Sequence, residues 1–343
     1  MNSKDPLVSV LTPVYNGEPY LEACIQSVLR QTYPNMEYVI VNNCSTDNSL
    51  NIARKYKEKD DRIRICTNSE FLPMIANFNH AARKISPDSV YCKIIHSDDL
   101  MFDNCIEKMV ALAESNISVG IVGSYVLQGD KVVGNGLSYP QTVFPGRELC
   151  RRSLNIRSAP GRIYVFGSPS SLLIKSDLIR KRDPLYNDKY HMCIDQELCY
   201  YLLQQESFGF IHEILTYSRV HHQSVSTSIN ENNPEIIEEL MLMQDYGPVY
   251  FEEKEHEKRF EQSVDRLYKF LSASIFQRKD KEFWKFQKEG LEKLNIRFNR
   301  IKLFIGALEV LVDKIARRLF HPSLTRKKHL PDSPNNTEVR RTV

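Results

Sequence analysis

Apolar, β-rich runs alternate with stretches of helical periodicity along the first 127 residues, and this alternation constrains the fold more than any other feature. After each of the first four runs, apolar residues recur every three or four positions, as in the segments Met74–Ile85 and Ile106–Ala113. Strands separated by helices of this length form a parallel sheet with helices on both faces, so we predict an α/β fold. The predicted strands are Val8–Thr12, Tyr38–Val41, Ile63–Cys66, Val90–Ile95 and Val119–Val126.

The pattern changes twice farther along the chain. A stretch rich in Gly and Pro follows residue 127, and residues 234–320 have helical periodicity throughout. We therefore expect a sheet domain over residues 1–230, with halves at 1–127 and 128–230, and a separate helical region over 231–321. Residues 322–343 contain little to bury, and we expect them to be disordered.

Charge and cysteine content narrow the class of protein. Lys and Arg exceed Asp and Glu by only 46 to 43, which argues against a dedicated nucleic-acid binder. The eight cysteines are scattered without a CxxC pair, as in reduced proteins of the cytoplasm. No run reaches the roughly 18 apolar residues that would span a bilayer. We expect a cytoplasmic protein.

Polar residues follow the predicted strands where each strand ends. In a sheet of this kind, ligands bind beyond the carboxyl ends of the strands. The adjacent Asp98 and Asp99 follow a run that is otherwise mostly apolar. Carboxylate oxygens in this position suit Mg²⁺ or Mn²⁺ bound together with a substrate phosphate. The alternative is that the two acids only cap the next helix.

Two common nucleotide signatures are missing from the sequence. There is no GxGxxG after the first predicted strand, and no GxxxxGK[ST] anywhere. This disfavours dinucleotide oxidoreductases and P-loop enzymes. The remaining interpretation is a nucleotide site in which polar strand ends hold the nucleotide and a metal ion binds its diphosphate.

Several separated segments resemble the family 2 glycosyltransferases, which have the GT-A fold. The resemblance covers about residues 7 to 226 and rests on VSVLTPVYNG, SVLRQTYPN, EYVIVNNCSTDNS, ANFNHAARKI and HSDDLM, in that order. It implies a Rossmann-like, mostly parallel sheet and an inverting, metal-dependent transferase. The implied donor is a nucleoside diphosphate sugar, with UDP as the expected nucleotide and Mn²⁺ or Mg²⁺ as the cofactor.

The resemblance also implies which residues hold the nucleotide. Thr12, Pro13 and Tyr15 match the segment that lines the base and ribose. Asn42 and Asn43 stand where the family commonly has an acid that accepts the uracil N–H. An amide oxygen accepts that bond with less strength than a carboxylate, so the base is less firmly specified here.

A second group of matches concerns the sugar-diphosphate and the metal. Asn77 and Asn79 match the family's Asn-rich motif near the sugar-diphosphate, although they also suit ordinary polar helix positions. Asp98 and Asp99 match the DxD-type metal and ribose site. His96 stands where many relatives have a first Asp, so the sequence leaves open which carboxylate binds the metal directly.

The resemblance places the reaction chemistry farther along the chain. IDQELCYYLL matches an acidic motif at a helix start, which makes Asp195 the candidate catalytic base and Glu197 a weaker one. Arg219 and His221, or His222 in its place, match a segment that closes over the diphosphate. The segment Gly167-Ser168-Pro169-Ser170 resembles an acceptor-side loop.

Residues 297–320 predict a basic amphipathic helix. Its apolar face comprises Ile301, Phe304, Ile305, Leu308, Leu311, Val312, Ile315 and Leu319. Its border and back carry Lys302, Lys314, Arg317 and Arg318. Such a face can lie on a membrane, here the inner face of the plasma membrane, or pack on the catalytic domain or another subunit.

The leading hypothesis is therefore a glycosyltransferase that acts on a glycan or lipid-linked oligosaccharide in cell-surface polysaccharide synthesis. Asn42, Asn43 and His96 each replace a likely acid, which leaves open a catalytically inactive relative that serves as a scaffold. A sugar nucleotidyltransferase is less well supported, because the loop after the first strand contains no Lys or Arg.

Overall fold

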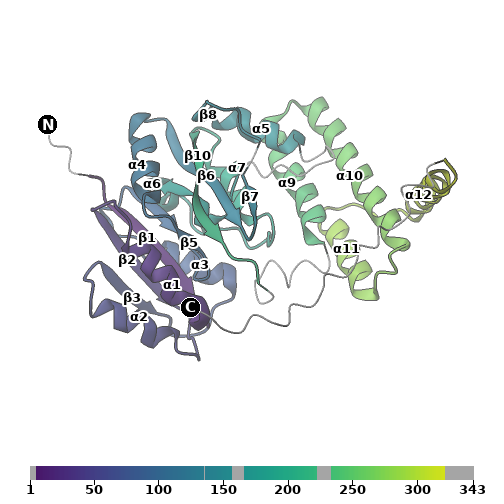
Figure 1. The fold of residues 1–343 in the computed structure, drawn as a ribbon. Coiled ribbons are helices and arrows are strands. Elements are labelled where there is room, and N and C mark those ends of the chain that lie inside the picture. Colours follow the sequence, from purple (N-terminus) through teal and green to yellow (C-terminus); the bar gives the residue numbers. More distant parts are fainter. Residues whose placement is uncertain (1–4, 135, 157–165, 222–232, 321–343) are drawn as a thin grey trace, which may run out of the picture.

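The computed structural model describes residues 5–134, 136–156, 166–221 and 233–320 (Figure 1). Its strands are β1 (Val8–Val14), β2 (Met36–Asn42), β3 (Ile63–Thr67), β4 (Tyr91–Ile94), β5 (Leu100–Met101), β6 (Val119–Gln128), β7 (Lys131–Val133), β8 (Val143–Pro145), β9 (Leu173–Lys175) and β10 (Ser207–Ser218). They form one sheet in the order β3-β2-β1-β4-β9-β6-β10-β5, with β7 on β6 and β8 on β10. The five strands predicted from the sequence correspond to β1, β2, β3, β4 and β6.

The longer pairings in this sheet are parallel. β1 pairs in parallel with β2 and β4, β2 with β3, and β10 with β6. Every antiparallel pairing involves a strand of two or three residues, namely β5, β7, β8 or β9. The expected α/β architecture is confirmed, and the short strands add its antiparallel part.

The helices are α1 (Glu18–Leu29), α2 (Ser49–Lys57), α3 (Met74–Ala82), α4 (Cys105–Ser115), α5 (Gly146–Ile156), α6 (Ser176–Arg180), α7 (Ile194–Leu202), α9 (Pro234–Tyr250), α10 (Glu253–Ile275), α11 (Lys281–Lys293) and α12 (Arg300–Phe320). Two cores flank the sheet. One is formed with α1, α2 and α4, and the other with α3, α5, α6 and α7. The sheet is therefore covered by helices on both faces, as the alternation predicts.

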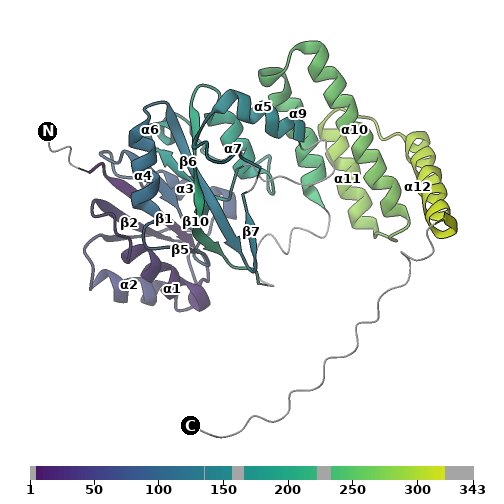
Figure 2. The same cartoon turned by 45° about the horizontal axis from the view of Figure 1, so that its top comes forward.

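The expected helical region after residue 234 is present, and its first helix is joined closely to the sheet domain. Buried residues of α9, α10 and α11 belong to the same core as α3 and α7. Figures 1 and 2 show α9 beside α7 and α5, with α12 at the end farthest from β3. Helix α9 is therefore part of the core of the sheet domain, whereas α12 lies at the periphery. The expected disordered tail, 322–343, lies outside the described residues.

Helix α12 contacts the molecule along one side only. A Cβ at Gly306 would stand 2.4 Å from Ser272 Oγ, so the glycine lets α12 approach α10 closely. Ser272 Oγ donates to the carbonyl of Leu303 at 3.1 Å. The other side is exposed, with Ile301 at 73% and Val312 at 63%. None of the described helices is long and apolar enough to cross a membrane.

Candidate active site

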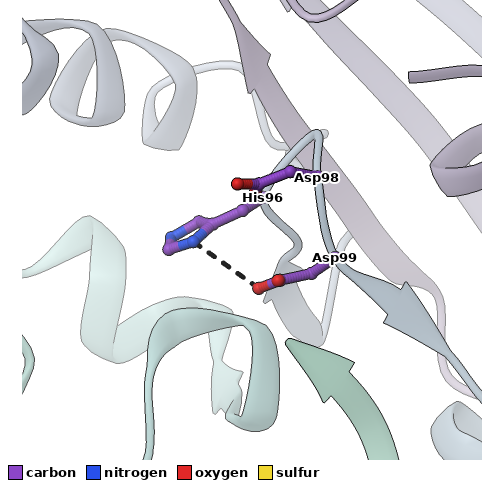
Figure 3. A group of neighbouring side chains, drawn as sticks. All are labelled: His96, Asp98 and Asp99. Carbon is purple, nitrogen blue, oxygen red and sulfur yellow. Dashed lines mark ion pairs between the residues drawn. The ribbon is translucent and has the colours of Figure 1, made fainter. Parts of the chain in front are cut away.

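The loop between β4 and β5 gathers the predicted metal-site residues. β4 lies in the centre of the sheet, between β1 and β9, and delivers His96, Asp98 and Asp99 to its carboxyl edge. One ligand atom from each of the three lies within 4.8 Å of the others. Figure 3 shows the three side chains pointing to the same side of the loop. The arrangement is a compact group of one nitrogen and two oxygen donors.

Asp99 is held firmly by groups from distant parts of the chain. Its carboxylate is buried and accepts from Ser170 Oγ at 2.6 Å and from the backbone N–H of Arg219 at 3.2 Å. His96 Nδ1 lies 3.6 Å from the same carboxylate. Burial raises the pKa of Asp99, whereas the nearby His96 works in the opposite direction. Ser170, expected in an acceptor-side loop, therefore supports the metal loop.

Asp98 is paired with a histidine from the end of β10. His221 Nε2 lies 3.0 Å from Asp98 Oδ2, and the guanidinium of Arg219 lies 5.3 Å from the ring centre of Tyr20. The structure thus brings together Asp98, Asp99, Arg219 and His221, which the sequence analysis assigned to one site. His222 lies outside the described residues.

The loop fits a divalent cation. A carboxylate offers about four lone-pair positions, and the hydrogen bonds to Asp99 come from Ser170 Oγ, the Arg219 N–H and the Ser218 side chain. His96 Nε2 is enclosed without a hydrogen-bond partner in the described chain. The carboxylates of Asp98 and Asp99 suit Mg²⁺ or Mn²⁺. Lone pairs therefore remain for an ion.

Asp195 lies in the first turn of α7 and interacts electrostatically with His96 of the same loop. Burial raises its pKa to about 7, and the charge of His96 lowers it, which places the two side chains in electrostatic range. Its Oδ1 is enclosed and has no hydrogen-bond partner among the described residues. Glu197, the weaker candidate, is bound at 2.8 Å on both oxygens by Arg182. Asp195 is therefore the acid that is free to accept a proton.

The loops after β1 and β2 present one exposed aromatic group and several engaged polar groups. Tyr15 is 49% exposed, and its ring centre lies 4.8 Å from that of Phe71. Thr12 Oγ1 is buried and 3.0 Å from Tyr38 OH, so its hydroxyl faces the core. Pro13 is buried within β1, between Thr12 and Val14. Of Thr12, Pro13 and Tyr15, the three residues predicted to line the nucleotide, Tyr15 has the most exposed side chain.

The candidate asparagines bind one another and the backbone. Asn43 Oδ1 accepts from Asn68 Nδ2 at 2.8 Å and from the Leu72 N–H at 2.9 Å. Asn42 Oδ1 accepts more weakly, from the Ser45 N–H at 3.3 Å. The side-chain oxygen of Asn42 therefore makes fewer and longer hydrogen bonds within the protein than that of Asn43.

The two asparagines of α3 are likewise engaged. Asn77 Oδ1 accepts from Asn68 Nδ2 at 3.0 Å. Asn79 exchanges two hydrogen bonds with the backbone of Tyr186, at 2.7 and 2.9 Å. Asn79 thus fixes the segment before α7 to α3.

Sequence reasoning missed Lys93 and Phe71. Lys93 is fully buried in β4, where burial lowers its pKa, and it donates to the carbonyl of Ser170 at 2.6 Å. A lysine inside an apolar strand was the available signal for Lys93. Phe71 lies in a loop after β3, where composition gives no signal.

An α/β sheet with carboxylates, imidazoles and an arginine beyond its central strands agrees with the GT-A fold expected from the sequence. The model of the glycosyl transferase family 2 matches residues 9–180. The chain belongs to this family and is a glycosyltransferase.

Two curated relatives illustrate the similarity. An uncharacterized glycosyltransferase of Rickettsia typhi is 30% identical over 234 residues, which cover 67% of this chain and 69% of the relative. The glycosyltransferase GlyG of Streptococcus pneumoniae is 29% identical over 187 residues, which cover 53% of this chain and 58% of GlyG. Both similarities thus leave a substantial part of each protein unmatched.

Solved structures share the fold at low identity. TarS 1–349 of S. aureus, in complex with UDP-GlcNAc, has a TM-score of 0.59 at 16% identity and covers 83% of this chain and 79% of its own. The mannosyltransferase PcManGT from Pyrobaculum calidifontis, in complex with GDP-Man and Mn²⁺, has a TM-score of 0.53 at 14% identity. The match covers 91% of this chain and 89% of PcManGT. These likenesses support the fold.

Proposed function

We propose that this protein is an inverting, metal-dependent glycosyltransferase that moves a sugar from a UDP-sugar to a hydroxyl group of a glycan or lipid-linked oligosaccharide. One observation carries the proposal: ligand atoms of His96, Asp98 and Asp99 lie within 4.8 Å of one another, and Asp195, a carboxylate with a raised pKa, interacts electrostatically with His96. Cell-surface polysaccharide synthesis is the process that such an acceptor would serve.

The residues divide into three roles. Tyr15 and Asn42 are assigned to the nucleoside, and Arg219 and His221 to the diphosphate. Exposure of Tyr15 supports the first assignment, and the contacts of Arg219 with Asp99 and of His221 with Asp98 support the second. Asp195 takes the proton of the acceptor hydroxyl as its oxygen bonds to the anomeric carbon. The bond from that carbon to the diphosphate oxygen breaks on the opposite face, and the nucleoside diphosphate leaves with the bonding electrons.

Asp98 and Asp99 would hold the divalent cation, with His96 as a further donor. When bound, the ion neutralises charge on the departing diphosphate. Ser170 and the Arg219 N–H keep Asp99 oriented toward the site, and the burial of Asp99 limits competition from water. The chain therefore supplies a preformed place for the ion.

A panel of sugar nucleotides tests this function. The full chain with Mn²⁺ should release nucleoside diphosphate from at least one donor, with faster release once a suitable acceptor is added. The same panel without metal, and with the Asp195→Asn variant, provides the controls. A folded protein that releases nothing from any donor would contradict the proposal.

We further propose that the exposed face of α12 lies on an anionic membrane surface at the inner face of the plasma membrane. Ile301, Phe304, Ile305 and Val312 are each more than half exposed. Beside them, a groove of about 640 Å³ between α10, α11 and α12 is lined mostly by apolar side chains. The sequence from Arg297 to Lys328 contains nine basic and two acidic residues. Apolar burial and roughly 1 kcal/mol per basic residue near anionic lipid would favour this contact.

Vesicle sedimentation tests the membrane contact. The protein should sediment with vesicles that contain anionic lipid, and binding should fall as salt rises. The double variant Ile301→Glu, Ile305→Glu should lose binding and keep donor turnover. Ile117→Glu, an identical change at an exposed isoleucine on the sheet domain, is the matched control. If both variants bind vesicles equally, or if the double variant instead converts a dimer to a monomer, the membrane proposal is wrong.

A further inference from the structure

The start of α7 is held by a carboxylate from the helical region. Glu238 of α9 is buried, with 4% of its surface exposed. Its Oε1 accepts from the His191 N–H at 2.9 Å, and its Oε2 accepts from the Met192 and Cys193 N–H groups at 2.8 and 2.7 Å. One side chain thus binds three successive backbone N–H groups directly before the helix.

The Glu238 carboxylate binds the backbone at and before the N-cap of α7. The N-cap residue of α7 is Cys193, whose side chain makes no capping hydrogen bond. The N–H groups at a helix start need acceptors, and a negative charge there is favoured by the helix dipole. Because Glu238 lies 45 residues from Cys193 in sequence, it is the helical region that fixes the backbone leading into α7.

A second contact with α9 holds the same helix just after Asp195. Tyr246 OH donates to Glu197 Oε1, and Arg182 donates to both oxygens of Glu197 at 2.8 Å. The side chains of Glu197 and Arg182 are 2% and 10% exposed, so this pair is largely shielded from water. Asp195 therefore lies between two contacts with α9. Glu238 holds the backbone of residues 191–193 before it, and Tyr246 holds the side chain of Glu197 after it.

Asp195 itself depends on this support. Its Oδ1 has no hydrogen-bond partner among the described residues, so the placement of the helix directs the carboxylate. An error of about 1 Å in the position of a reacting group can cost on the order of 10²-fold in rate. By holding the backbone that leads into α7, helix α9 therefore sets the position of Asp195.

We propose that Glu238 is a positioning residue for Asp195, which makes α9 part of the catalytic machinery. This inference rests on the proposed transfer reaction, because it assumes that Asp195 takes the acceptor proton. Glu238 touches no reacting atom. It acts by fixing the backbone of residues 191–193, which leads into the first turn of α7.

The test compares Glu238→Gln and Glu238→Asp with the wild-type full chain in the presence of Mn²⁺. An amide in place of the carboxylate puts an NH₂ group against backbone N–H donors, so kcat should fall by about 10²-fold. The affinity for UDP, measured by calorimetry, should change by less than about twofold, because the nucleotide loops do not contact Glu238. The shorter carboxylate of Glu238→Asp should give an intermediate kcat.

Glu239→Gln is the matched control, since Glu239 is the next residue of α9 and pairs with Arg266 of α10. It should keep kcat and UDP affinity near the wild-type values. If an active wild type and Glu238→Gln have equal kcat, or if kcat falls only in proportion to the number of UDP-binding sites, the positioning role is wrong. If Glu238→Gln fails to fold, Glu238→Asp decides by the same criteria. A wild type that turns over no donor would instead remove the proposed function.

Discussion

The two carboxylate regions of the site, the loop after β4 and the first turn of α7, hold their acids in different ways. Asp99 accepts hydrogen bonds on both oxygens, and Asp98 is paired with His221. Asp195 is enclosed with Oδ1 lacking a partner in the described chain, and burial raises its pKa to about 7. An oriented carboxylate with spare lone pairs suits a cation, whereas an unbonded one with a pKa near neutrality suits proton transfer. Under the proposed function, the loop after β4 would bind the ion and the first turn of α7 would supply the base.

The largest expected effect is that of Asp195→Asn. Removing a general base should lower kcat by about 10³-fold, within the range for such groups. UDP affinity in the presence of Mn²⁺ should stay unchanged, because the ion belongs to the other region. Steady-state kinetics and calorimetry on the same preparation check both outcomes, with the exposed Asp188→Asn as a control. If Asp195→Asn also loses UDP binding, the first turn of α7 and the loop after β4 do not have separate roles.

The stability of Asp195→Asn should separate it further from a simple loss of folding. The pKa of Asp195 is raised from 3.8 to about 7, so ionisation costs folding free energy that grows as the pH rises through this interval. Asn avoids this cost. The variant should therefore have a higher Tm than the wild type, with a larger difference at pH 8 than at pH 5. Equal differences at both pH values would contradict the raised pKa.

Asp99→Asn should have the next largest effect, and it should act on the ion. Loss of one negative charge should weaken Mn²⁺ binding at least about 10-fold, as even changes around a metal site commonly do. UDP affinity should then lose its dependence on metal. Asp103→Asn, which removes an exposed ion pair with Arg30 close to the same loop, is the control. Paramagnetic resonance of free Mn²⁺ measures the affinity, and unchanged binding would place the ion elsewhere.

The pH dependence of kcat should show a smaller, reversible effect. A base must be deprotonated to act, so a pKa of about 7 predicts that kcat falls as the pH drops below 7. Saturating donor and Mn²⁺ should be maintained at every pH. A midpoint near the ordinary value for Asp would indicate that Asp195 is not the group that titrates in the reaction.

The smallest effect should come from Thr12→Val. The Thr12 hydroxyl is buried against Tyr38 OH, so it should contribute about 1 kcal/mol to stability and little to nucleotide binding. The donor KM should change by less than about twofold, while the unfolding free energy falls. A tenfold rise in KM would show that the hydroxyl reaches the nucleotide and belongs to the site.

The sequence predicted the part of the fold that rests on local patterns. β1 to β4 and β6 were predicted because their apolar runs alternate with helical spacing. The short strands β5, β7, β8 and β9 have two or three residues, too few for any periodicity. Their places are set by tertiary pairing with β4, β6 and β10.

The candidate site shows the same division. Strand ends placed Asp98, Asp99 and Asn43 at the correct edge, because the carboxyl ends of parallel strands meet there. The contacts that assign their tasks join residues far apart in sequence. Ser170 lies 71 positions from Asp99, and Asn43 is engaged by Leu72, 29 positions away. Spacing in the chain carries no information on such pairs.

Anomalous diffraction at the manganese edge, from crystals soaked with UDP and Mn²⁺, tests the central assignment most directly. We expect one strong peak in direct contact with a carboxylate oxygen of Asp98 or Asp99, with the diphosphate beside it and Asp195 outside the coordination sphere. A peak coordinated by Asp195, or bound UDP with no peak at the loop after β4, would contradict it.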